Sequence, residues 1–183
     1  TGAQDGVVLK INPTCTDIMW STYLGGKQDD AAFVLAINPA TNEVYVAGAT
    51  LSNDFPGDKT GTLQPLHSGS IDGYVAVISN NGATLVKSTF LGTPDPDLVY
   101  GIQFDRNNFP YVMGTSLGSW QVINAPYSVP GSKQFVSKLR RDLSGFEYST
   151  VFGTNSVERN ISPVAFMVDR CENVYISGWG GIM

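Results

Sequence analysis

The chain is poor in charged residues and cysteine and has no long apolar run, and each shortage excludes a class of protein. Charged residues make up 15% of the 183 residues and hydrophobic residues 42%, which is unlike a disordered tail. The formal net charge of -5 disfavours nucleic acid and acidic membrane surfaces as partners. No apolar run approaches the roughly 20 residues that a bilayer requires, so we expect no membrane insertion.

Residues that carry catalysis or hold cofactors are equally scarce. Cys15 and Cys171 form neither a CxxC pair nor a zinc-ligand spacing, and His67 is the single histidine. The sequence has no phosphate loop, no HExxH and no GxSxG elbow. We therefore predict that this chain is not an enzyme and carries no cofactor.

What the chain does have is an internal repeat. STYLGG at 21–26 returns as STFLGT at 88–93 and as STVFGT at 149–154. Two further motifs recur in step: DGVVLKI, DGYVAVI and KQFVSKL begin at 5, 72 and 133, and EVYVAG, FPYVMG and NVYISG begin at 43, 109 and 173. A fixed order of motifs at offsets of 61 to 67 residues indicates a repeat architecture.

Each repeat contains four short runs rich in Val, Ile, Tyr and Phe, which is strand chemistry. Tight-turn sequences such as PATN (39–42) and NNGA (80–83) separate them, and no stretch has a sustained helical period. The predicted strands are 6–12, 17–24, 32–38, 43–50, 72–79, 84–91, 99–105, 110–116, 134–140, 146–152, 164–169 and 174–178.

Four-stranded antiparallel units of even spacing are typical of the blades of a β-propeller. A β-sandwich is the alternative, but it has no reason to repeat its sequence. We predict an all-β chain, a partial propeller of about three blade equivalents: a half blade at 6–24, blades at 32–91 and 99–152, and a half blade at 164–178. Closed propellers need about 4–8 blades, so we expect an open arc, completed by the remaining blades of a longer parent chain or held by a partner.

The repeats resemble a bacterial seven-bladed propeller repeat family known as SBBP. The matching residues are DGVVLKI, MWSTYLGGKQDDAA, VLAINP, NEVYVAGATLSNDFP and DGYVAVI. NISPVAFMVDRCENVYISGWGG is similar to the end of propellers in large Bacteroidetes surface proteins with PKD domains, gliding-motility regions and type IX secretion. The resemblance implies a secreted, cell-surface location. Lys133 and Gln134 depart from the pattern, which has Asp-Gly there.

The alternation of strand direction assigns each loop to a face of the propeller, and we call this the parity of the strands. In an antiparallel blade, alternate connections emerge on the same face, so the short turns share one face. The other face carries the long connections, 51–71 and 117–133, and the acidic exits near 27–31, 93–98 and 154–163. Long loops on a rigid scaffold are common binding sites. We predict that Phe55, His67, Trp120 and Tyr127 lie on the face of Asp29 and Asp95. The candidate ligand-binding residues are Asp29, Asp30, Phe55, Asp95, Asp97, Trp120 and Tyr127.

The acidic exits have two interpretations. Asp29 with Asp30, Asp95 with Asp97, and Glu158 offer oxygen ligands that could hold calcium, although no dedicated calcium loop is present. Alternatively they are solvated, or Asp29 and Asp30 accept backbone N–H bonds where the chain crosses between blades.

Two further expectations concern packing between units. Trp20, in a strand, should pack between blades. Cys15 and Cys171 belong to half units two blades apart, too far for a disulfide.

These observations favour a non-enzymatic interaction or adhesion module of a secreted or surface bacterial protein, which contacts a protein or a surface glycan. A propeller-type glycan lyase or hydrolase is the alternative, and a passive spacer between adhesive domains is a third.

Overall fold

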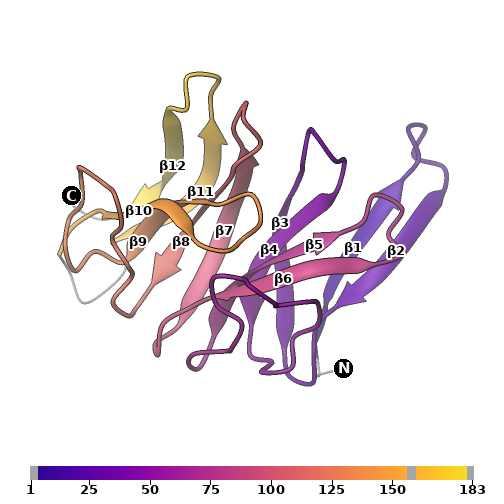
Figure 1. Ribbon diagram of the computed structural model, residues 1–183, viewed down its shortest axis with the longest axis horizontal. Coiled ribbons are helices and arrows are strands. Elements are labelled where there is room, and N and C mark those ends of the chain that lie inside the picture. The colour runs from indigo at the N-terminus through magenta and orange to yellow at the C-terminus, as the bar shows by residue number, and fades with distance from the viewer. Residues whose placement is uncertain (1–3, 156–159, 181–183) are drawn as a thin grey trace.

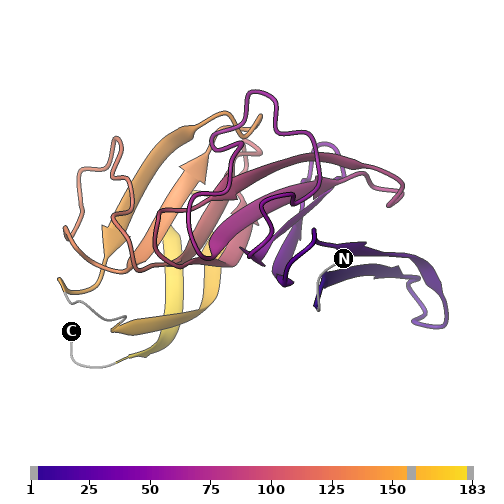
Figure 2. The same ribbon diagram turned by 90° about the horizontal axis from the view of Figure 1, so that it is seen from below.

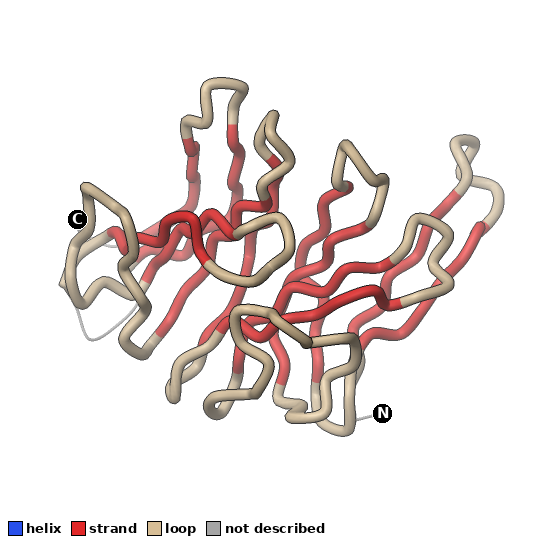
Figure 3. Tube along the Cα trace, viewed as in Figure 1, coloured by secondary structure: helices blue, strands red, loops and turns tan. Residues whose placement is uncertain are grey.

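The computed structural model describes residues 4–155 and 160–180, and within them every regular element is a β-strand. Figure 3 shows strands joined only by loops and turns. The all-β class is thus confirmed, and a strand lies at each of the twelve predicted places. The strands are β1 (Gly6–Ile11), β2 (Ile18–Leu24), β3 (Asp30–Ile37), β4 (Val44–Thr50), β5 (Asp72–Ile78), β6 (Leu85–Leu91), β7 (Asp97–Phe104), β8 (Pro110–Ser116), β9 (Gln134–Leu139), β10 (Phe146–Phe152), β11 (Ile161–Val168) and β12 (Val174–Gly180).

The strands form four antiparallel sheets in chain order (Figure 1). The N-terminal hairpin is β1–β2, the first sheet is β3-β4-β5-β6, the second sheet is β7-β8-β9-β10, and the C-terminal hairpin is β11–β12. Each four-stranded sheet is a simple meander, in which every strand pairs with its neighbour in sequence. The two hairpins lie at opposite ends of the molecule, with the two larger sheets between them (Figure 2).

The sheets share one irregularity, which explains a repeated glycine. β3, β7 and β11 each carry a bulge. The residue before the bulge faces Gly48 on β4, Gly114 on β8 or Gly178 on β12. A side chain on any of these glycines would overlap a backbone carbonyl of the bulged strand. The glycine of EVYVAG, FPYVMG and NVYISG is therefore a packing requirement.

Two apolar cores hold neighbouring sheets together. One joins Val8 and Leu24 of the N-terminal hairpin to Val46, Tyr74 and other residues of the first sheet. The other joins the first sheet to the second and includes Val75, Val77, Ile102 and Phe135. β4 and β8 lie within these layers and are buried along their whole length. Both faces of the first sheet are therefore covered by apolar cores.

The long connections cover edges, which parity alone did not predict. The loop 51–71 runs beside β6: Ser88 N–H donates to Asp58 O at 3.0 Å, and Phe90 N–H donates to Gln64 O at 3.0 Å. The loop 117–133 runs beside β10 through a bridge between Ile123 and Ser149. Both loops occupy the hydrogen-bonding groups of an outermost strand and so protect it from other chains.

Trp20 packs between sheets as expected, since its ring covers Gly82 and its Nε1 donates to Asn80 O at 3.3 Å. Cys15 and Cys171 are both free thiols at exposed turns of the two hairpins. Across the part of the chain that the structure describes, no helix is long and apolar enough to cross a membrane.

Candidate functional site

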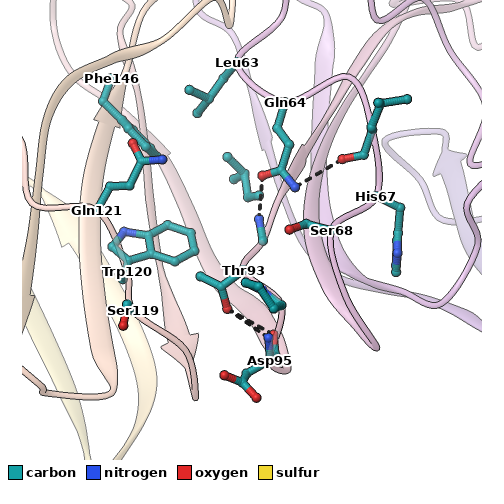
Figure 4. A pocket seen from close by; sticks show the side chains of 14 residues that line it. Leu63, Gln64, His67, Ser68, Thr93, Asp95, Ser119, Trp120, Gln121 and Phe146 are labelled. Atoms are coloured by element: carbon teal, nitrogen blue, oxygen red, sulfur yellow. Dashed lines mark hydrogen bonds between the residues drawn. The ribbon is translucent and has the colours of Figure 1, made fainter.

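A cleft of about 680 Å³ opens between the two four-stranded sheets (Figure 4). Trp120 and Gln121, from the loop after β8, form one wall, and Gln64 and His67, from the loop after β4, form the other. Thr93 to Asp95, in the exit from the first sheet, close the cleft between them. The complete lining is Leu63, Gln64, Leu66, His67, Ser68, Leu91, Gly92, Thr93, Pro94, Asp95, Ser119, Trp120, Gln121 and Phe146.

Trp120 is held rigidly in the cleft wall. Its ring stacks on Phe135, with centroids 3.6 Å apart and planes 9° apart. Its Nε1 donates to Ser149 Oγ at 3.0 Å and lies 3.2 Å from Ser137 Oγ. Ser149 is the serine of STVFGT, so a serine that occurs in all three copies of this motif holds the Trp120 ring in place here. One face of the indole is covered by Phe135, and the side chain remains only partly buried.

Gln64 fixes the opposite wall through both ends of its amide. Its Oε1 accepts from Gly92 N–H at 2.9 Å, and its Nε2 donates to Asp72 Oδ2 at 3.2 Å. Its backbone N–H also donates to Thr89 Oγ1 at 3.1 Å. Sequence reasoning missed Gln64, Ser119 and Gln121, because no motif marks them. The only available signal was their place in long loops next to the repeat.

His67 and Asp95 are the titratable side chains of the described lining. The His67 ring packs edge-on against Phe90, and its Nε2 lies 3.2 Å from Thr50 O. Asp95 is exposed, and its backbone is tied to Thr93: Thr93 Oγ1 accepts from Asp95 N–H at 3.3 Å. The cleft therefore combines one aromatic wall, two amides, an imidazole and a carboxylate.

The other acidic candidates brace the chain where it passes from one sheet to the next. Asp30 Oδ2 accepts from Gly26 N–H at 2.7 Å and Ser52 Oγ at 2.8 Å, and Asp29 Oδ1 accepts from Gln4 N–H at 3.0 Å. The expected role of Asp29 and Asp30 as acceptors of backbone N–H bonds is thus confirmed. Asp97 likewise accepts from Thr93 N–H and from its hydroxyl. Asp30 and Asp97 are buried, and neither lines the cleft.

The aromatic candidates separate into different places. Trp120 lines the cleft, as does His67, together with Asp95. Phe55 is only 1% exposed and packs on Tyr74, with ring centroids 4.3 Å apart, so it anchors its loop. Tyr127 is exposed on the loop beside β10, outside the cleft. Glu158 lies outside the described residues.

Burial changes the ionisation of the acids beside the cleft. Desolvation, reinforced by the negative charge of Asp72, raises the pKa of Asp97 to about 6. Desolvation also raises the pKa of Asp72, against the hydrogen bond from Ser68 N–H. Nowhere in residues 4–155 and 160–180 do three or more His, Cys, Asp or Glu side chains gather as metal ligands would. A calcium site built from the acidic exits has no support in this arrangement.

No protein-family model matches the chain, and no curated protein matches it either.

Proposed function

We propose that the chain is a section of a β-propeller that serves as a non-enzymatic interaction module and binds a saccharide in the cleft between its two complete sheets. The observation that carries this proposal is the rigid Trp120 ring facing polar side chains across a concave site. Ligand sites are typically clefts of about 300–1,000 Å³ in which a few fixed polar groups orient the ligand beside aromatic surface. The cleft falls within this range.

The chemistry of the lining favours a sugar over an apolar ligand. Gln121 and Asp95 are exposed: the Gln121 amide can donate hydrogen bonds to hydroxyl groups and accept them, and the Asp95 carboxylate can accept them. The Trp120 ring offers apolar surface for the carbon face of a pyranose. Glycoside hydrolysis uses a pair of carboxyl groups, whereas the lining formed by the described residues has one, that of Asp95.

The repeated register of the sheets supports the propeller architecture. Each first strand bulges opposite a glycine of the second, and successive sheets pack face to face through apolar cores. On the motifs quoted above, we assign the repeats to the SBBP type and the protein to the bacterial cell surface. Other surface domains of the parent protein would then carry the rest of its adhesion function.

The test is a glycan array followed by calorimetric titration of the best saccharide. Gln121→Ala and Asp95→Asn should each weaken binding about tenfold, because each removes a hydrogen-bonding group from the site. Gln28 is another exposed glutamine and lies outside the cleft, so Gln28→Ala should bind the saccharide as the unsubstituted chain does. Absence of any saccharide binding would contradict the proposal. Release of new reducing ends would show a hydrolase instead.

A further inference from the structure

The cleft between the two four-stranded sheets has negative charge and no fixed positive charge in its described lining. Asp95 supplies the carboxylate of that lining and is exposed, and no lysine or arginine belongs to the lining. Lysines of the neighbouring loops are held elsewhere by backbone carbonyls: Lys59 Nζ donates to Phe55 O, and Lys133 Nζ donates to Leu117 O at 2.7 Å. A ligand in the cleft therefore meets a free carboxylate that no neighbouring ammonium neutralises.

Two buried carboxylates add negative charge from beneath the cleft. Asp72 and Asp97 are both 0% exposed. Asp72 Oδ2 accepts from Ser68 N–H at 2.7 Å, and Asp97 Oδ2 accepts from Thr93 Oγ1 at 2.9 Å, so both acids hold residues of the lining. Among the described residues, neither acid forms an ion pair with a lysine or arginine. The pKa of Asp97 is raised to about 6, which leaves its carboxylate mostly ionised at neutral pH.

The strongest hydrogen-bonding groups left free in the cleft are acceptors. Both ends of the Gln64 amide are occupied by other residues of the chain. His67 Nε2 lies 3.2 Å from Thr50 O, and because a carbonyl only accepts, this nitrogen carries the ring proton. In the neutral imidazole the other nitrogen, Nδ1, is then an acceptor, as is the Asp95 carboxylate. The site therefore favours a ligand that is rich in N–H or O–H donors.

Trp120 offers the ligand the face of its ring and not its N–H group. Its Nε1 already donates to Ser149 Oγ at 3.0 Å, and Phe135 covers one face of the indole. The side chain nevertheless remains partly exposed in the lining, close to Thr93 and Asp95 in Figure 4. An aromatic face attracts a cation by about 0.5–2 kcal/mol, and it also packs against the carbon atoms of a sugar.

We propose that the saccharide bound in this cleft is an amino sugar, whose protonated amine contacts Asp95 and the Trp120 ring. The ammonium group brings three N–H donors to a site of acceptors and a positive charge to a site of carboxylates. A uronic acid would instead place a second negative charge beside Asp95 with no lysine or arginine of the lining to receive it. The inference rests on the proposed function, because it names the class of saccharide for the same cleft.

The first test is calorimetric titration with a matched pair of saccharides near neutral pH. A chitosan oligomer carries a basic amine on every sugar, and the chitin oligomer of the same length carries a neutral acetylated nitrogen in its place. We expect the chitosan oligomer to bind at least about tenfold more tightly, because a hydrogen bond to a charged group contributes about 1.5–3 kcal/mol. An oligogalacturonate, which is acidic, should bind more weakly than either.

The outcomes of this titration separate the inference from the proposed function. Equal affinities for the chitosan and chitin oligomers, or tighter binding of the oligogalacturonate, would overturn the amino-sugar assignment and leave saccharide binding in place. Failure of these three probes and of every saccharide on the glycan array would overturn both.

The second test asks whether Asp95 sets the preference. Asp95→Asn keeps the size of the side chain and removes its charge, so the chitosan and chitin affinities should come within about threefold of one another. Gln121→Ala removes a neutral group and should weaken both oligomers while keeping their ratio. Asp58→Asn is the matched control, because Asp58 is an exposed aspartate outside the cleft lining, and both affinities should stay unchanged. A full preference in Asp95→Asn would contradict the inference, and circular dichroism reports that each variant is folded.

The third test separates an amino sugar from other cations. Salt screens charges, with a Debye length of about 10 Å at 0.1 M and about 3 Å at 1 M, so added salt should weaken binding of the chitosan oligomer several-fold more than binding of the chitin oligomer. Tetralysine carries amines without a sugar ring and should bind at least about tenfold more weakly than the chitosan oligomer, because it has no pyranose to pack on Trp120. Equal salt dependence of the two oligomers, or tetralysine binding as tight as that of the chitosan oligomer, would overturn the assignment.

Discussion

Replacement of Phe55 by alanine distinguishes a loop anchor from a ligand contact. The Phe55 side chain is 1% exposed and packs against Tyr74 and Phe90, and Lys59 Nζ donates to its carbonyl oxygen. Truncation of a buried phenylalanine costs about 3–5 kcal/mol, and we expect about 3 kcal/mol because a loop, unlike a strand within a sheet, can close part of the cavity. For a chain of this length that lowers the Tm by about 6 °C or more.

The assay is urea unfolding at a fixed protein concentration, followed by circular dichroism. Leu66→Ala is the matched control, because Leu66 belongs to the same loop and is 76% exposed. It should change the free energy of unfolding by no more than about 0.5 kcal/mol. Phe55→Leu should recover part of the loss. If Phe55→Ala were as stable as Leu66→Ala, the loop would not be anchored by this ring.

Three further outcomes follow from the structure. Gly48→Ala should destabilise the chain by several kcal/mol in thermal unfolding, because a methyl group there overlaps Ala31 O, whereas Gly145→Ala, with no such overlap, should be nearly neutral; equal stability would contradict the bulge geometry. The pKa of Asp97 is raised to about 6 in the folded chain against about 3.9 in the unfolded chain, so the folded state binds more protons. The contribution of Asp97 to stability therefore falls as the pH rises from about 4 to 6. Asp97→Asn should remove that fall when urea unfolding is measured across this pH range. Lys138→Val should cost about 3–5 kcal/mol by leaving Asp105 buried and unpaired, and adding Asp105→Asn should restore most of it in the same assay.

The strands could be predicted because their signals are local. Runs such as DGYVAVI and FPYVMG combine β-branched and aromatic residues with flanking turn residues, and three occurrences of each reinforce the assignment. The Gly of each EVYVAG-like motif was visible as well, but its cause was not. The overlap with the bulged strand exists only once two strands are paired.

The cleft was predictable only in part because its walls are held by contacts between residues that are far apart in the sequence. Trp120 was identifiable as a bulky aromatic in a polar loop, but its support by Phe135 and Ser149 depends on the loop running along β10. Phe55 has the same apparent character in sequence, yet its loop turns the ring inward onto Tyr74. Parity gives the edge at which a loop leaves its sheet and says nothing of where the loop then goes.

The buried acids show the same distinction. Asp30 and Asp97 are indistinguishable in sequence from Asp29 and Asp95, their exposed neighbours. Strand alternation explains the outcome, since Asp30 and Asp97 begin β3 and β7 and point inward. Their carboxylates then accept hydrogen bonds from backbone N–H groups of the preceding exit. The main role of these two acids is therefore to fix the chain where it passes from one sheet to the next.

Calorimetric titration of the best saccharide from the glycan array tests the central claim most directly. The account predicts binding that Gln121→Ala and Asp95→Asn each weaken about tenfold and that Gln28→Ala leaves unchanged. Absence of binding, or equal binding by all three variants, would contradict it.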